Sequence, residues 1–396
     1  MIRRPPRSTH CISSAASDVY KRQPLSLYIH IPWCVKKCPY CDFNSHPLED
    51  DVDQKRYLDS LLEDWQVQST TIPALENADF SQDGFKTVFF GGGTPSLFKP
   101  ELMAKLLRQL PIAVDAEVTM EANPGTQEYT DFEHYLSAGI NRLSIGAQSF
   151  QNTQLAKLGR VHNSAETIAA VAKARAAGFT NINIDLMWGL PGQSLEDALF
   201  DLESAIALSP QHISWYQLTI EAKTEFAKRP PLLPIDGILA EIEIKGNELL
   251  AGQGYSRYEI SAYAKDAAFC QHNINYWSFG DYVGLGAGAH GKVSEDEQIL
   301  RTQKASQPRL YQGEPTKTSK QRVAEEQLPL EFMMNALRLI DGTSLTTFTE
   351  KTGLDWQVIA TQWDGLLAQG LVRPDRCSTT ELGLRYLDTV LEKFVS

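Results

Sequence analysis

Residues 28–43 read YIHIPWCVKKCPYCDF and place Cys34, Cys38 and Cys41 in a C-x3-C-x2-C spacing. Thiolates are the soft ligands that hold iron–sulfur clusters. Three cysteines leave one iron of a four-iron cluster open, so that this iron can bind a small molecule. A structural zinc loop completed by His46 is the alternative, because a zinc site needs a fourth ligand. We expect a [4Fe–4S] cluster on the three cysteines.

The remaining composition is that of a large protein with few cysteines. The chain has 396 residues, 42% of them hydrophobic, and a formal net charge of −12. This charge argues against a general nucleic-acid or anionic-membrane binder. Three further cysteines, Cys11, Cys270 and Cys377, are scattered. A single tight cysteine cluster indicates a metal site in a reducing compartment, so we expect a soluble, cytoplasmic protein.

The first 23 residues, MIRRPPRSTHCISSAASDVYKRQ, stand apart because they hold five basic residues and one acidic residue. An Arg-rich, Ser-rich and acid-poor segment is typical of an organelle transit peptide. Pro5 and Pro6 oppose the amphipathic helix of such a peptide. The segment also resembles translated sequencing-adapter sequence. We favour this second interpretation and expect residues 1–23 to be non-native or disordered.

From residue 25 onward, short apolar runs alternate with amphipathic stretches of helical spacing. The candidate strands are residues 27–31, 86–90, 117–121, 142–146, 181–186 and 212–219. The candidate helices are residues 53–68, 101–110, 131–139, 164–178 and 194–208. This alternation predicts an α/β fold with a parallel sheet. Six units favour a partial (β/α)6 barrel with an open side over a full eight-unit barrel.

Polar and small residues gather where these strands end. Cys34 follows the first strand, glycines 91–93 follow the second, Glu121 ends the third, Gln148 follows the fourth, and Asp185 lies at the end of the fifth. In barrels and open α/β sheets the chemistry lies at the carboxyl ends of the strands. The agreement across separate segments predicts one site at that end of the sheet.

Beyond residue 230 the pattern changes. We expect a helix over residues 235–253, a strand over 258–263, and a long loop over 301–322. Residues 355–385 suggest a helix, a two-stranded wing and another helix. The predicted divisions are a barrel over 24–230, a middle region over 231–322, and a winged-helix-like domain over 323–396. Because the basic residues of that last domain are few and mixed with acidic ones, partner docking is favoured over DNA binding.

The flanks of the cysteine loop make the pattern more specific. Tyr40 stands before the last cysteine, and the segments FFGGGTPS, EANPG, RLSIGAQSF, LGRVHN and NIDLMWGLPGQ follow in order. The sequence resembles the radical-SAM family, in the branch that contains oxygen-independent coproporphyrinogen III oxidase (HemN). The resemblance covers residues 25–396. It implies that the open iron presents S-adenosylmethionine (SAM).

The resemblance also implies which residues contact SAM. These are Tyr28, Tyr40, Gly92, Gly93, Thr94, Glu121, Gln148, Arg160 and Asp185. The glycines permit close backbone approach and offer N–H groups to SAM, with a tight turn as the alternative. Glu121 suits ribose hydroxyls, and an inward Arg160–Asp185 ion pair is the structural alternative. Ser144 and Gln193 read equally well as ordinary polar residues.

Two features separate the chain from HemN itself. Phe43 stands where HemN has a fourth cysteine. HemN also has a long N-terminal arm before the cluster, whereas here only the ten residues from Pro24 to Trp33 separate the set-apart segment 1–23 from Cys34. Downstream, HNINYW matches the H-N-x-x-Y-W motif of the haem chaperones (HemW) of this branch, and the matched residues are His272, Asn273, Tyr276 and Trp277. Neutral imidazole is an axial haem ligand, and aromatic rings offer apolar surface to a porphyrin. The alternatives are a core role for His272, ligation by His290, and attachment through Cys270.

The favoured hypothesis is a haem chaperone that binds haem and passes it to an acceptor haemoprotein. It would carry the [4Fe–4S] cluster and SAM. Contact with respiratory membrane proteins and a homodimer are left open, and no nucleic-acid partner is expected. One alternative is a radical-SAM oxidoreductase that acts on a porphyrinogen. The other is a scaffold that only senses redox state.

Overall fold

The computed structural model describes residues 25–49, 52–72, 75, 84–125, 132–295 and 298–395. Its main feature is a twelve-stranded sheet in the order β14-β13-β12-β11-β1-β4-β5-β6-β7-β8-β10-β9. The seven strands from β11 to β8 run parallel, and the outer strands on both sides pair antiparallel. The prediction for residues 1–23 lies outside the described residues.

The six predicted strands all form and neighbour one another in chain order. They are β1 (Leu25–Ile31), β4 (Phe85–Gly92), β5 (Ile112–Ala122), β6 (Arg142–Gln148), β7 (Asn181–Trp188) and β8 (His212–Gln217). A seventh parallel strand, β11 (Asp281–Leu285), adds to β1 in a register that pairs Leu25 with Asp281. The sequence pattern did not predict this strand, because the segment GDYVGLGAGAHG is rich in glycine and glycine is depleted in strands.

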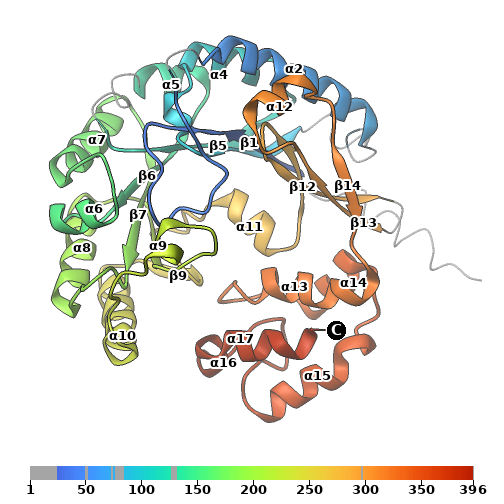
Figure 1. Ribbon diagram of the computed structural model, residues 1–396. Coiled ribbons are helices and arrows are strands. Elements are labelled where there is room, and N and C mark those ends of the chain that lie inside the picture. The colour runs from blue at the N-terminus through green and yellow to red at the C-terminus, as the bar shows by residue number, and fades with distance from the viewer. Residues whose placement is uncertain are drawn as a thin grey trace, which may run out of the picture.

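Helices cover the outer face of the sheet, which curves as an open arc (Figure 1). They are α2 (Gln54–Thr71), α4 (Pro100–Leu107), α5 (Phe132–Ala138), α6 (Asn152–Lys157), α7 (Ser164–Ala176), α8 (Leu195–Ala207) and α10 (Asp236–Gly252). Capping boxes start two of these helices, Asn163 with Glu166 at α7 and Ser194 with Asp197 at α8. No described helix is both long and apolar enough to cross a bilayer.

The sheet edges differ from the sequence-based expectation. Residues 301–322 do not form a loop, because they contribute to β13 (Gln298–Gln303), α12 (Pro308–Gly313) and β14 (Ser319–Arg322). The strand expected over 258–263 is a hairpin of β9 (Ser256–Glu259) and β10 (Ala262–Ala264). Polar edge strands show no clear apolar alternation, which explains both errors. The strand β12 (His290–Glu295) joins β13 to β11.

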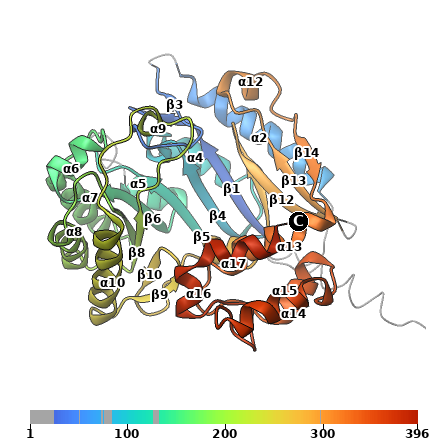
Figure 2. The same ribbon diagram turned by 60° about the horizontal axis from the view of Figure 1, so that its bottom comes forward.

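The C-terminal residues form a helical unit with its own hydrophobic core. Its helices are α13 (Leu328–Ala336), α14 (Leu345–Thr352), α15 (Gln357–Ala368), α16 (Glu381–Arg385) and α17 (Leu387–Leu391). Phe332 and Trp363 are buried in this core, and Phe279 of the preceding region joins it. Figure 2 shows the unit beside one end of the sheet. The predicted boundaries at residues 230 and 322 stay predictions.

The remaining short elements connect these parts. They are β2 (Trp33–Cys34), β3 (His46–Pro47), α9 (Glu225–Lys228), α11 (Gln271–Trp277) and the 3-10 helices η2 (Pro95–Leu97), η3 (Glu325–Gln327) and η4 (Glu392–Phe394). The helix α11 lies inside the arc of the sheet, on the side away from the covering helices (Figure 1). His272 of this helix contacts Phe89 and Thr87 of β4.

Candidate functional site

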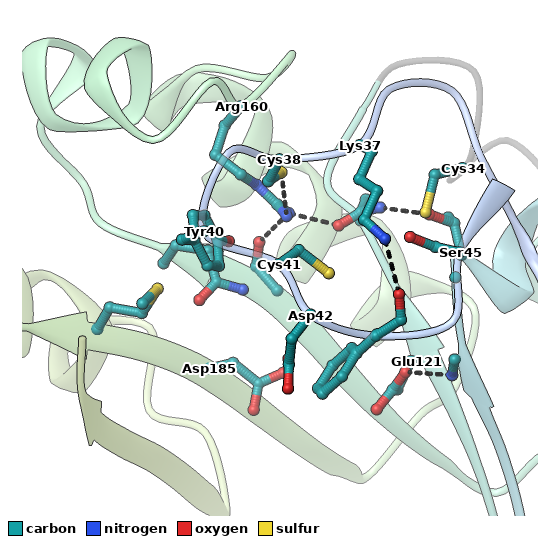
Figure 3. A pocket seen from close by; sticks show the side chains of 18 of the residues that line it. Cys34, Lys37, Cys38, Tyr40, Cys41, Asp42, Ser45, Glu121, Arg160 and Asp185 are labelled. Carbon is teal, nitrogen blue, oxygen red and sulfur yellow. Dashed lines mark hydrogen bonds between the residues drawn. The ribbon is translucent and has the colours of Figure 1, made fainter. Parts of the chain in front are cut away.

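A cavity of about 500 Å³ opens at the carboxyl ends of the parallel strands. Its wall includes Cys34, Cys38, Cys41, Tyr40, Gly92, Gly93, Thr94, Glu121, Gln148, Arg160 and Asp185. Figure 3 shows the three cysteines, Arg160, Glu121 and Asp185 around one space. Tyr28 is the one residue expected at SAM that does not line the cavity; its hydroxyl instead donates to Nδ1 of His30 at 3.0 Å.

The cysteine loop is anchored by backbone hydrogen bonds. The N–H of Leu48 donates to the Cys34 carbonyl at 2.9 Å, and the N–H of Cys41 donates to the Cys38 carbonyl at 3.1 Å. The Thr94 hydroxyl lies 3.5 Å from Cys34 Sγ, where it can donate. All three thiols are half-buried and free of disulfides. The loop therefore presents three separate sulfur ligands to one cavity.

This donor set fits a polynuclear cluster. Burial raises the pKa of the Cys34 and Cys41 thiols, and iron coordination would remove their protons. The guanidinium of Arg160, 3.8 Å from Cys38 Sγ, adds a positive charge beside the sulfurs. Among the described residues, no group of three His, Cys, Asp or Glu side chains is arranged to hold a single metal ion.

Close packing requires the glycines at the end of β4. A Cβ on Gly92, whose φ is +113°, would lie 2.4 Å from the His30 ring, and one on Gly93 would lie 2.5 Å from the Trp33 carbonyl oxygen. The N–H of Gly92 donates to Glu121 at 3.2 Å, and that of Gly93 donates to the Ile31 carbonyl. Both N–H groups have partners inside the protein in this structure, and contact of Gly92 and Gly93 with SAM stays a prediction.

Two half-buried carboxyl groups, Glu121 and Asp185, face the same space. Burial and the nearby Asp185 raise the pKa of Glu121 to about 8. Burial also raises the pKa of Asp185, which accepts from Ser144 at 2.9 Å and from Asn183 at 2.8 Å. A cationic ligand would relieve the cost of ionising these acids. The cavity is therefore suited to a ligand that carries positive charge and hydroxyl groups.

Arg160 does not bind Asp185, so the expected structural alternative is wrong within the described residues. The guanidinium donates to the Gly146 carbonyl at 2.8 Å and to Asn123 Oδ1. Asn123 donates in turn to Thr94 Oγ1 at 2.8 Å. Asn123 was overlooked in the sequence, although it lies in the quoted EANPG segment directly after the third strand.

Tyr216, near the end of β8, is a second overlooked residue of the cavity wall. Its hydroxyl donates to Gln148 Oε1 at 2.6 Å. Gln148 itself has a φ of +66°, a left-handed conformation that costs energy for a non-glycine residue. Ser144 also lines the cavity. Gln193 does not line it, and its side-chain oxygen accepts a hydrogen bond of 3.1 Å from the Leu190 N–H.

The histidine of HNINYW lies inside the fold. His272 is 1% exposed, its Nδ1 is 2.7 Å from Thr87 Oγ1, and its Nε2 is 2.9 Å from the Tyr276 hydroxyl. Burial and the charge of Arg142 lower the pKa of His272 to about 3. In this conformation both ring nitrogens of His272 have partners, as in a core histidine, and its role as a haem ligand stays a prediction.

The rest of the motif surrounds this ring. Asn273 and Trp277 are half-buried on α11, and the Arg338 guanidinium lies 4.3 Å from the centre of the Trp277 ring. Within the described chain, the indole N–H of Trp277 has no hydrogen-bond partner. Cys270 is buried beside Glu117, whereas His290 is exposed at the start of β12.

Comparison with known proteins assigns the family. The model of the Radical SAM superfamily matches residues 28–204, and that of the HemN C-terminal domain matches residues 323–386. The chain is 48% identical over 383 residues to "Heme chaperone HemW" of Escherichia coli (strain K12), which covers 95% of this chain and 99% of that protein. The chain belongs to the HemW family.

Other relatives are less similar to this chain. "Heme chaperone HemW" of Bacillus subtilis (strain 168) is 36% identical over 83% of this chain and 87% of its own length. "Radical S-adenosyl methionine domain-containing protein 1, mitochondrial" of Mus musculus is 33% identical over 92% and 86%. The structure of Escherichia coli HemN, a coproporphyrinogen III oxidase, has a TM-score of 0.77 at 22% identity and covers 96% of this chain and 92% of its own. That likeness concerns the fold.

Membership in the HemW family confirms the resemblance seen in the sequence. It also confirms an α/β radical-SAM fold followed by a HemN-type C-terminal domain. Phe43 is 60% exposed and lines the cavity that the three cysteines share.

Proposed function

We propose that this HemW-family chain is a haem chaperone that binds haem and transfers it to an acceptor haemoprotein. The observation that carries the proposal is the 48% identity, over nearly the whole length of both chains, to a protein named as a haem chaperone. The three cysteines and the eight other predicted residues that line the cavity support the accompanying cofactors, a [4Fe–4S] cluster and SAM. The barrel would be a partial six-unit barrel extended by β11.

Within the cavity, the chain's own residues have separable tasks. Cys34, Cys38 and Cys41 would hold the cluster, and a cluster with three protein ligands supplies an open iron. Arg160 would place positive charge beside the sulfurs. Glu121 and Asp185 would receive the cationic and hydroxyl groups of SAM.

The ionisation of Glu121 predicts how SAM affinity depends on pH. Because the pKa of Glu121 is about 8 before SAM binds, the protonated acid is the main form at neutral pH. A positively charged ligand favours the carboxylate, so binding must release a proton. We expect affinity to rise by up to about tenfold per pH unit as the pH approaches 8, and then to level off.

Calorimetric titration of the reconstituted protein with SAM between pH 6 and 9 measures this rise. The Glu121→Gln variant serves as the matched control and should show a much flatter profile. An equally steep profile in that variant would assign the pH dependence to another group.

For haem, we propose that α11 supplies the binding residues and must rearrange to do so. The Tyr276 hydroxyl occupies Nε2 of His272, so this hydrogen bond has to open before the nitrogen can act as a ligand. The free indole N–H of Trp277 and the rings of Tyr276 and Tyr282, with centroids 4.4 Å apart, offer polar and apolar contacts to a porphyrin.

Haem titration of single variants tests this assignment. We expect the wild-type chain to give a Soret band, and His272→Ala to weaken haem affinity by at least about tenfold, because an axial ligand is lost. His290→Ala tests the exposed alternative and should leave affinity unchanged. If His290→Ala weakens binding and His272→Ala does not, the ligand lies at the edge of the sheet instead of on α11.

The remaining parts of the proposal concern partners and location. We propose a cytoplasmic protein whose acceptor is a haemoprotein, with contact to respiratory membrane proteins and homodimer formation as extensions. The C-terminal unit is proposed to be winged-helix-like and to dock a partner. Two isolated antiparallel bridges, Thr343 with Cys377 and Val372 with Thr379, support a small wing in this unit.

A further inference from the structure

A line of buried hydrogen bonds leads away from the cavity at Asp185. Oδ1 of Asp185 accepts from the Asn183 amide at 2.8 Å, and Asn183 lies two residues earlier on β7. Oδ1 of Asn183 is 2.6 Å from Nδ1 of His212 on the neighbouring strand β8. Asn183 and His212 are each 1% exposed. These hydrogen bonds connect Asp185 to buried side chains of β7 and β8.

The line continues to the first residues of α11. Nε2 of His212 is 2.8 Å from the Tyr258 hydroxyl on β9, and the backbone N–H of Cys270 donates to the same hydroxyl at 3.2 Å. Cys270 is the residue that caps the start of α11, two positions before His272. The helix that carries HNINYW is thus attached at its start to the wall of the cavity.

The donors of this line all point in one direction. The amide oxygen of Asn183 can only accept, so Nδ1 of His212 carries the proton and Nε2 accepts from Tyr258. Burial and the nearby Arg142 charge lower the pKa of His212, which agrees with a neutral ring. Every donor from Cys270 onward is directed toward Asp185. Hydrogen bonds arranged in this way polarise and strengthen one another at low dielectric.

We propose that Asn183, His212 and Tyr258 are positioning residues that couple ligand occupancy at Asp185 to the start of α11. When a cationic or hydroxyl-bearing ligand engages Asp185, the carboxylate form is favoured and each hydrogen bond of the line strengthens. The N–H of Cys270 is then held more tightly, which fixes the position of His272. The functional consequence of this coupling is a haem motif that responds to SAM, and that consequence rests on the proposed function.

Hydrogen exchange of the peptide that covers residues 270–277 tests the coupling without haem. The cluster-loaded protein is compared with and without saturating SAM. We expect SAM to slow exchange of this peptide by at least about fivefold, the low end of ordinary coupling between sites. In Tyr258→Phe the hydroxyl is lost while the ring stays, so the slowing should disappear even though SAM still binds.

Tyr263→Phe is the matched control. Tyr263 is a buried tyrosine of the adjacent strand β10, and its hydroxyl donates to Asn247 at 2.7 Å, outside the line. It should keep the full SAM-dependent slowing. His212→Gln provides a second interruption if Tyr258→Phe folds poorly, as judged by circular dichroism.

The proposal is overturned if SAM leaves exchange of residues 270–277 unchanged in the wild-type chain. It is equally overturned if Tyr258→Phe and His212→Gln retain the slowing. Haem titration is measured separately on the same proteins. A chain that shows the coupling but binds no haem would refute the proposed function alone, and a chain that binds haem without the coupling would refute this inference alone.

Discussion

Replacing Cys38 with alanine should abolish the iron–sulfur cluster while the fold remains. Cys38 is half-buried and free, and its sulfur contacts the Arg160 guanidinium at the cavity wall. Because only three cysteines would hold the cluster, two are not enough to retain it, and the variant should lose nearly all of its visible cluster absorbance and bound iron. SAM affinity should fall with it, because the open iron is lost as well. Anaerobic reconstitution followed by absorbance and iron analysis measures this.

The chain offers a matched control in Cys377→Ala. Cys377 is a buried cysteine of the C-terminal core, where its sulfur contacts Met333 at 3.9 Å. The control should retain the cluster, although the small cavity left behind lowers stability by about 1 kcal/mol. Full iron content in Cys38→Ala would show that the cluster is held by other ligands.

The second large effect is expected at a buried ion pair that joins α2 to the edge of the sheet. Lys304 donates to Asp64, and the two side chains are 2% and 0% exposed. Tyr311 and Gln68 also donate to the same carboxylate, at 2.9 and 2.8 Å. Lys304→Met removes the only cation that faces Asp64 in these contacts. We expect the free energy of unfolding to fall by about 3–5 kcal/mol, the usual cost of an unpaired buried charge.

The pH dependence of this variant has a definite sign. Burial raises the pKa of Asp64 above its ordinary value of 3.8, and Lys304 opposes that rise. Without Lys304 the folded state holds the proton more strongly than the unfolded state does. The stability deficit should therefore be smallest at low pH and should grow as the pH rises through the pKa of Asp64 in the folded wild-type chain, which lies above 3.8.

Denaturant unfolding of three proteins tests this prediction. The double variant Asp64→Asn with Lys304→Met removes both charges and should recover most of the lost stability. A single variant as stable as the wild-type chain would contradict the prediction. A double variant no more stable than the single one would show that the loss does not come from an unpaired charge.

The sequence predicted the parallel strands and the cavity for a common physical reason. Apolar runs bounded by helices specify strands, and the ends of parallel strands meet at one edge, which brought Cys34, Glu121 and Asp185 together. The strand β11 was not predictable in this way. Its glycines remove the apolar pattern, and its position beside β1 depends on a pairing across more than 250 residues, as the Leu25–Asp281 register shows.

The side-chain partners were the least predictable part of the site. The choice of Asn123 over Asp185 as the partner of Arg160 depends on how adjacent strand ends are spaced, which no local pattern encodes. The placement of α11 inside the arc of the sheet likewise depends on tertiary packing. For this reason the sequence left His272 open between a haem ligand and a core residue, and the structure shows the core arrangement.

The central claim, that this chain carries haem, is tested most directly by titrating the anaerobically reconstituted wild-type protein with haem. The account predicts a saturable Soret band at one haem per chain that decreases when an apo-haemoprotein is added as acceptor, as the acceptor's own haem spectrum appears. An absent or unsaturable band, or haem that never reaches the acceptor, would contradict it.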